Sequence, residues 1–161
     1  MHESAHLAEA LSGLLFEDEN GWFLPAYQAM EGLSAEQAAR SPGEKFNSPW
    51  AIVRHMSYWM EFILLRLRGE DPKAMLGEDW LPLPDPASES AWAADQQHLR
   101  EVTGELAEAV RAWDETQLEA PFSNNNHNHR QIIQGIMGHN CYHTNELICS
   151  RHMLGYWLEQ T

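Results

Sequence analysis

Apolar residues recur at spacings of three and four along three long segments of the chain, residues 48–69, 86–114 and 128–154. This spacing puts the apolar side chains on one face of an α-helix, because a helix makes a turn every 3.6 residues. The sequence shows no convincing alternation of apolar and polar residues, which is the pattern of half-buried strands. It therefore predicts an all-α fold.

The segment 48–69 begins with Ser48 and Pro49. A serine side chain accepts a hydrogen bond from a free backbone N–H at a helix start, and a proline in the first helical position has no such donor to lose. We expect this helix to end near Gly69. Its apolar face carries Ile52, Met56, Trp59, Ile63 and Leu67.

The first forty residues are less regular than the rest. We expect a helix from Ser4 to about Phe16, a break at residues 19–21, a second piece over residues 25–31 and a short helix after Ser34. Ser34 and Gln37 fit a capping box, in which each side chain bonds the other's backbone N–H. This short helix would precede the second main helix.

Prolines and capping residues divide the second half of the chain. Residues 71–86 contain four prolines, which cannot continue a helix, so we expect a crossover loop there. Asn128 and Gln131 predict a capping box at the start of the last helix, which would end at about Leu154. The apolar face of helix 86–114 carries Trp92, Leu99, Val102, Leu106, Val110 and Trp113. Four long helices in 161 residues predict a four-helix bundle formed as a single domain over residues 1–161.

The charge of the chain excludes two classes of partner. Lys and Arg number 10 against 24 Asp and Glu, a net charge of -14, whereas nucleic acids and anionic membrane surfaces bind clustered cations.

No apolar run reaches the ~18–20 residues of a membrane span, and the N-terminal residues lack a signal-peptide pattern. Cys141 and Cys149 are eight residues apart on one expected helix, about 12 Å, too far for a disulfide. We therefore expect a reduced, cytoplasmic protein.

Two histidines fall on the expected inward face of the last helix. His139 and His143 are four residues apart, which puts both rings on the same side about one turn from each other. Helices present two imidazoles to one metal ion in this way. The face reads Ile132, Ile136, His139, His143, Leu147, Ser150 and Leu154.

A third histidine, His55, lies at the edge of the apolar face of helix 48–69, next to Met56 and one turn before Trp59. Three imidazoles from two facing helices would leave coordination positions for water or substrate, as in catalytic or ligand-binding sites. The alternative for each ring is a core histidine bonded to a carbonyl. We predict a metal site formed by His55, His139 and His143.

Glu146 follows His143 by three residues and is the one candidate catalytic residue. It would either hold the second nitrogen of a ligand histidine or act as a base beside metal-bound water, and the alternative is a carboxylate at the edge of the bundle. A di-iron site would need Glu-x-x-His motifs, and neither His139 nor His143 has a glutamate three residues before it.

The remaining histidines, the cysteines and several tryptophans and arginines have weaker claims to a functional role. We expect His127 and His129 to be a solvated loop pair, and His2, His6 and His152 to be exposed. Neither cysteine is assigned a nucleophilic role. Trp50 and Trp59 are candidates for the wall of a substrate pocket, and Arg54, Arg66 and Arg151 are the few cations that an anionic thiol would need.

Residues 48–56 (SPWAIVRHM) and 138–146 (GHNCYHTNE), together with Arg151 and residues 154–155, resemble the DinB-like family of damage-inducible, metal-dependent proteins. Residues 32–38 also resemble the family's segment ahead of its first metal histidine. The resemblance implies an up-up-down-down four-helix bundle, commonly a homodimer, that binds one divalent metal ion per chain, nickel or zinc with iron as the alternative. By position, its ligands are His55, His139 and His143.

The family often has Gly-Gln where this chain has Asn145-Glu146, so a contact behind a ligand is expected to differ. Relatives include bacillithiol transferases and the mycothiol-dependent maleylpyruvate isomerase, in which the metal activates a low-molecular-weight thiol. The resemblance thus implies a stress- or damage-inducible, metal-dependent enzyme of thiol-transferase or hydrolase type that acts on a small molecule.

Two other classes of function stay open. One is a non-catalytic helical protein that binds a metal or small ligand, and the other is a helical interaction module without a metal. A pocket that reaches the metal would favour chemistry, whereas a sealed site would favour a structural role.

Overall fold

The computed structural model describes residues 2–16, 23–75, 77–122 and 126–158. Over these residues the chain is helical and has no β-strand, apart from an isolated bridge between Pro121 and Asn128. The all-α prediction is confirmed, while the break expected at residues 19–21 lies outside the described residues. The elements are α1 (Glu3–Phe16), α2 (Ala26–Met30), α3 (Ala35–Ala39), α4 (Pro49–Leu67), the 3-10 helix η2 (Lys73–Met75), α5 (Glu89–Arg111), α6 (Glu115–Glu119) and α7 (His129–Met153).

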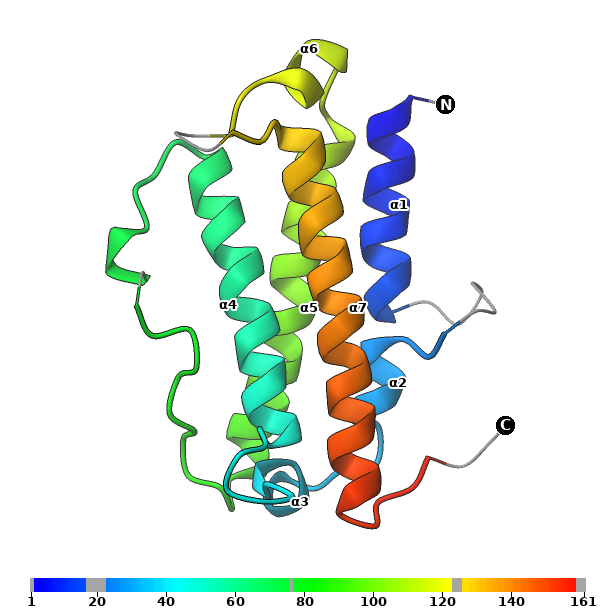
Figure 1. Ribbon diagram of the computed structural model, residues 1–161, viewed down its shortest axis with the longest axis vertical. Helices are drawn as coiled ribbons and strands as arrows, with labels where there is room; N and C mark the ends of the chain where they lie inside the picture. Colours follow the sequence, from blue (N-terminus) through cyan, green and yellow to red (C-terminus); the bar gives the residue numbers. More distant parts are fainter. Residues whose placement is uncertain (1, 17–22, 76, 123–125, 159–161) are drawn as a thin grey trace.

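Four long helices, α1, α4, α5 and α7, lie side by side (Figure 1). α1 contacts α5 and α7, and α4 contacts the same two helices, so the contacts close a ring. The short helices α2 and α3 lie near the end of the molecule where α1 finishes and α4 begins (Figure 1).

The direction of the long helices differs from the order that the resemblance implied. In Figure 1, α1 and α7 run downward and α4 and α5 run upward, so the order along the chain is down-up-up-down rather than up-up-down-down. The reason is that α2 and α3 keep the chain at the end where α1 finishes, and α4 must run back from there. The crossover of residues 68–88 then returns the chain to the same end, which makes α5 parallel to α4.

The helix ends follow the capping residues seen in the sequence. The Ser48 side chain accepts a hydrogen bond from the Ala51 backbone N–H at the start of α4, and Gly69, just past its end, adopts a positive φ of 79°. Both predicted capping boxes are present, at the starts of α3 and α7. A third box, formed by Asp114 and Gln117, begins α6, a helix that the sequence analysis did not predict.

The core fills the space between the four long helices. Trp50 of α4 and Trp92 of α5 are both fully buried, with ring centroids 5.4 Å apart, and burying side chains of this size stabilises the fold by roughly 1.5–3 kcal/mol each. The largest fully buried side chains are Trp50, Trp92, Leu11, Leu15, Met30, Ile52, Met56, Met60, Leu99, Leu106, Leu118 and Ile133.

The buried face of α7 is rotated slightly from the predicted one. Ile136, His143, Leu147 and Ser150 are buried as expected, but Ile132, His139 and Leu154 are half-buried. Their places are taken by Ile133, Asn140, Thr144 and Arg151. Three of these are polar, and they are satisfied internally by hydrogen bonds to backbone carbonyls or side chains, which a count of apolar residues cannot anticipate.

No helix among the described residues combines the length and the apolar character that a membrane span requires.

Candidate metal centre

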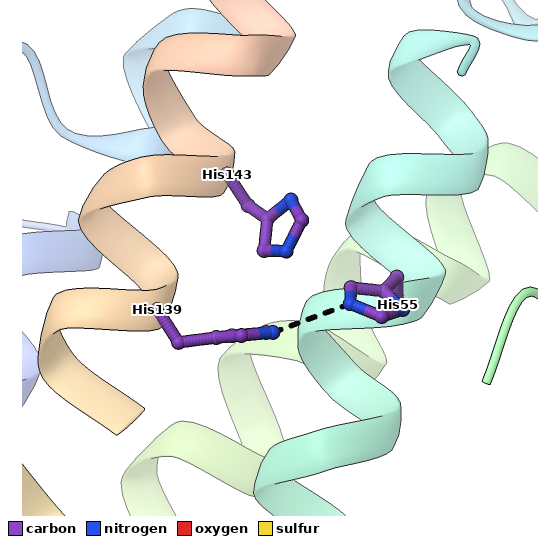
Figure 2. A group of neighbouring side chains, drawn as sticks. All are labelled: His55, His139 and His143. Carbon is purple, nitrogen blue, oxygen red and sulfur yellow. Dashed lines mark hydrogen bonds between the residues drawn. The ribbon is translucent and has the colours of Figure 1, made fainter. Parts of the chain in front are cut away.

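The fold brings the three predicted histidines together between α4 and α7. His55 is on α4, and His139 and His143 are one turn apart on α7; Figure 2 shows the three rings pointing toward one another. His55 and His143 are buried, and His139 is half-buried at the edge of the core. One ring nitrogen from each histidine lies within 4.8 Å of the other two.

The shortest contact joins two ring nitrogens. The Nε2 atoms of His55 and His139 are 3.2 Å apart, and their ring centroids are 4.6 Å and 4.4 Å from that of His143 respectively. Two nitrogens bound to one tetrahedral zinc ion, with bonds of about 2.0–2.1 Å, would lie about 3.3 Å apart. The spacing of these two nitrogens therefore fits a shared metal ion.

Each ring is also held from behind through its Nδ1 atom. The three contacts are His55 Nδ1 to the Asp79 carbonyl at 2.9 Å, His139 Nδ1 to Asn140 Oδ1 at 3.2 Å and His143 Nδ1 to Glu146 Oε2 at 2.7 Å. A carbonyl, an amide oxygen and a carboxylate can only accept, so each Nδ1 carries the proton. In the neutral ring the lone pair then lies on Nε2.

This proton arrangement decides what the Nε2 atoms can do. Two lone pairs that face each other at 3.2 Å, as in His55 and His139, repel unless a proton or a cation lies between them. Ligand histidines in metal sites characteristically donate their other ring N–H to a carbonyl or carboxylate. The donor set thus matches a divalent metal site.

Burial favours the neutral, metal-binding form of His139 and His143. Burial, together with the two neighbouring imidazoles, lowers the pKa of His139 to about 4, against the raising effects of the Asn140 hydrogen bond and of Asp79. Burial also lowers the pKa of His143, against the raising effect of its hydrogen bond to Glu146. Neutral rings offer a metal ion their lone pairs without first losing a proton.

Two aromatic side chains enclose the rings. Trp80, from the crossover loop, stacks on His55 with centroids 4.0 Å apart and an interplanar angle of 7°, and its ring meets His143 edge-on at 5.9 Å. Trp59 meets His55 and His139 edge-on at 6.4 Å and 6.5 Å. Its Nε1 donates to the Asp79 carboxylate at 3.2 Å, which ties the loop to α4.

Sequence reasoning missed Asp79, Trp80 and Asn140. Asp79 and Trp80 lie in the proline-rich crossover, where no periodicity indicates which residues face the core. Asn140 could have been found from the sequence, because it is adjacent to His139 on an expected helix and one turn before Thr144. Its amide donates to Met60 Sδ at 3.2 Å, which orients the amide oxygen toward His139.

Glu146 uses both of its oxygens. One accepts from His143, and the other accepts from the Asn47 side chain at 2.9 Å. The geometry favours the first of the two roles considered for this residue, which is to hold the second nitrogen of a ligand histidine. The segment before α4 contributes to that role, because Asn47 immediately precedes the Ser48 cap.

Several other predicted residues lie elsewhere. Trp50 is fully buried and donates to Asp95 of α5 at 2.6 Å, so it does not wall the site, whereas Trp59 does. Arg54 also bonds Asp95, at 2.8 Å. Arg151 is buried and donates to the carbonyls of Ala29 and Tyr156, which makes it a structural residue.

The remaining histidines divide into exposed and stacked rings. His2, His6 and His127 are exposed as expected. His129 is not the solvated residue that was predicted, because it begins α7 and stacks on Trp113 with centroids 5.0 Å apart. His152 is half-buried and stacks on Trp157 at 4.6 Å, so the expectation of an exposed ring is corrected there as well.

A pocket of about 610 Å³ opens between α4 and α7 and reaches His139. Its walls are mainly apolar, with Trp59, Phe62 and Phe122 as their aromatic residues. This volume lies within the range of about 300–1,000 Å³ typical of small-molecule sites. One member of the three-histidine group, His139, therefore lines a cavity that can hold a ligand.

Comparison with known proteins gives one result. The family model of the DinB superfamily matches residues 26–147, a range that includes all three histidines. Neither the curated proteins nor the solved structures contain a match to the chain.

Proposed function

Because the chain belongs to the DinB superfamily, which contains metal-dependent enzymes, we propose that it is a divalent-metal-dependent enzyme. In this proposal His55, His139 and His143 bind one metal ion per chain through their Nε2 atoms. The observation that carries it is the set of three Nδ1 contacts, which turn three Nε2 lone pairs toward one another.

The number of ligands supports catalysis rather than a purely structural role. Structural zinc sites use four protein ligands, whereas catalytic sites use three and leave a position for water or substrate. The pocket that reaches His139 would supply the access that such a position needs. When bound, the metal would supply a thiolate or hydroxide that is stable near neutral pH.

The surrounding residues prepare the site in two ways. Glu146, Asn140 and the Asp79 carbonyl hold the Nδ1 protons and so fix the orientation of each ring. Trp59 and Trp80 cover the rings with apolar surface, which excludes water and strengthens the electrostatic interactions inside. In this account Glu146 positions His143, and the role of a catalytic base is not assigned to it.

The reaction we propose is thiol transfer or hydrolysis on a small molecule. For a low-molecular-weight thiol, the arrangement favours one with little negative charge. Arg54 and Arg151 are engaged away from the site, and Arg66 lies 5.6 Å above the Phe62 ring and 3.9 Å from Asp71. Imidazole ligands suit nickel and zinc, our first candidates, and also iron.

We further propose a four-helix bundle of the DinB type, a homodimer and a cytoplasmic location. The closed ring of contacts between α1, α5, α4 and α7 supports the bundle, in the down-up-up-down order described above. The two cysteines are free and exposed, which suits a reducing compartment. Sedimentation velocity would test the dimer.

The function is tested by comparing metal-free, zinc-loaded and nickel-loaded protein in two assays. One measures addition of a small uncharged thiol to an electrophile, and the other measures ester hydrolysis. We expect one activity to require metal and to be lost in His139→Ala, with Asn145→Ala as the control on the exposed face of α7. Metal binding without either activity would favour the alternative of a non-catalytic binding protein. An activity of the same size with and without metal would contradict the proposal.

A further inference from the structure

The pocket beside His139 differs in character from the rest of the surface. Among the residues that the structure describes, no Lys, Arg, Asp or Glu lines it, although the chain carries a net charge of -14. Of the described residues that line it, the polar ones besides His139 are His127 and Gln131. An anionic group placed there would lose its hydration without gaining a cationic partner.

Aromatic and aliphatic side chains form the walls of this pocket. Trp59 and Phe62 of α4 meet edge-to-face with centroids 5.4 Å apart, and Phe122 contributes from the segment before α7. Such walls bind flat, apolar groups, which remove apolar surface from water and pack against the ring faces and edges. The part of the wall formed by His139 is different, because there an imidazole offers a polar contact.

We propose that this pocket binds the uncharged, aromatic or similarly apolar body of the substrate, with the substrate's polar reacting group directed toward His139. The proposal rests on the proposed function, since it assigns a substrate class to the same site. It commits to a small molecule because the cavity is lined by His139, a member of the three-histidine group, and has the volume of a ligand pocket.

Gly135 provides a way to fill the pocket without disturbing the fold. It lies on α7 in the pocket wall, and a Cβ atom built there would meet nothing within 4 Å. A leucine at this position would project into open space and would favour the helix more than glycine does. Gly104 of α5 is a matched control, because it is also helical and open but does not line the pocket.

The first experiment measures binding of N-phenyl-1-naphthylamine, an uncharged fluorophore that brightens in apolar surroundings. We expect wild type and Gly104→Leu to bind it equally and Gly135→Leu to bind it about tenfold more weakly or worse, because the side chain occupies apolar volume. Thermal melting confirms that each variant folds, and Gly135→Met is the second variant if leucine prevents folding.

Three results would overturn the proposal. They are no binding by wild type, equal binding by Gly135→Leu, and a change in sedimentation of Gly135→Leu that shows the pocket to be filled by a second copy of the chain. Bound metal, measured on the same samples, separates this proposal from the proposed function. If protein that takes up no metal still binds the probe, the proposed function is contradicted and the pocket proposal stands. If the protein takes up metal but does not bind the probe, only the pocket proposal is contradicted.

The second experiment tests the connection between the pocket and the histidines. Cobalt-loaded protein is titrated with imidazole and with 4-phenylimidazole, and the visible absorbance of cobalt reports binding. We expect wild type to prefer 4-phenylimidazole by about tenfold, because its ring would be buried in the pocket. Gly135→Leu should lose that preference while retaining imidazole binding, and equal affinities in wild type would contradict the connection.

Discussion

The three histidines differ in the group that holds each Nδ1 proton. A backbone carbonyl holds His55, a side-chain amide holds His139 and a carboxylate holds His143. A carboxylate is the strongest acceptor of the three and makes its imidazole the best electron donor. The Asn145-Glu146 departure from the family pattern thus includes the residue that bonds His143, one of the proposed ligands.

Glu146→Gln should weaken metal binding about tenfold, since a neutral amide replaces the carboxylate behind His143 and mutations of such partners typically cost about 10–100-fold in affinity. The affinity is measured by competition with a chromophoric chelator. Asn145→Ala, on the exposed face of the same helix, is the control and should bind as wild type does. Equal affinities in wild type and Glu146→Gln would show that the carboxylate has no role in the site.

His129 should make the fold sensitive to acid. Burial lowers its pKa, so the folded protein resists protonation of this ring, whereas the unfolded chain takes up the proton below about pH 6.5. Its contribution to stability is therefore fully present above that pH and is lost as the pH falls through the lower folded-state pKa. His129→Phe, which keeps a ring against Trp113, should lose less unfolding free energy than wild type between pH 7 and pH 5 in urea titrations. Parallel pH profiles would contradict this assignment.

At the residue scale, the sequence predicted the three histidines, which lie on regular helices. His55, His139 and His143 could be predicted to meet because each has a defined place in a helical period. Asp79 and Trp80 could not, because a proline-rich crossover has no period to indicate its inward side. The stacking of His129 depends on Trp113, which lies just past the end of α5.

At the scale of elements, the crossover between α4 and α5 does more than connect two parallel helices. Asp79 bonds both Trp59 and His55, and Trp80 lies flat against His55, so residues 79–80 form one side of the histidine group. If this loop becomes more mobile, the histidine group should therefore become more mobile too, and the converse should also hold.

Asp79→Ala should loosen the crossover, because it removes the acceptor for Trp59 Nε1. We expect faster amide hydrogen exchange over residues 77–83 and faster loss of metal to a chelator. Glu78→Ala, an exposed neighbour of the same charge, is the control. If both variants exchange and release metal as wild type does, the loop does not hold the site.

The first turn of α4 should contribute measurably to stability. Ser48→Ala removes the cap on the Ala51 N–H and should lower the free energy of unfolding by about 1 kcal/mol. Ser48→Thr, which keeps a hydroxyl, should lose less. Chemical denaturation of both variants measures the difference. An alanine variant as stable as wild type would show that the Ser48 cap does not contribute to stability.

Helix starts were predictable because caps are local chemistry, as Ser34, Ser48 and Asn128 show. The helix α6 was missed although Asp114 and Gln117 form the same kind of box as the one that predicted the equally short α3. The rotation of the buried face of α7 was missed because Asn140, Thr144 and Arg151 are buried polar residues, whose partners come from the tertiary structure.

At the scale of the whole molecule, the parallel pair α4 and α5 and the crossover between them determine where the site lies. α4 and α7 run in opposite directions and face each other, with the histidines between them (Figure 1, Figure 2). The apolar pocket opens beside His139. The crossover returns along the outside and covers His55. One arrangement of helices thus provides the ligands, their outer partners and a route of access.

The central claim is that His55, His139 and His143 together hold one metal ion. It is tested by inductively coupled plasma mass spectrometry on untagged protein purified without chelator and then offered zinc or nickel, beside the variants His55→Ala, His139→Ala and His143→Ala, with the exposed His6→Ala as control. We expect about one ion per chain in wild type and in the control, and loss of that ion in each of the three variants. No metal in wild type, or a full complement in any of the three variants, would contradict it.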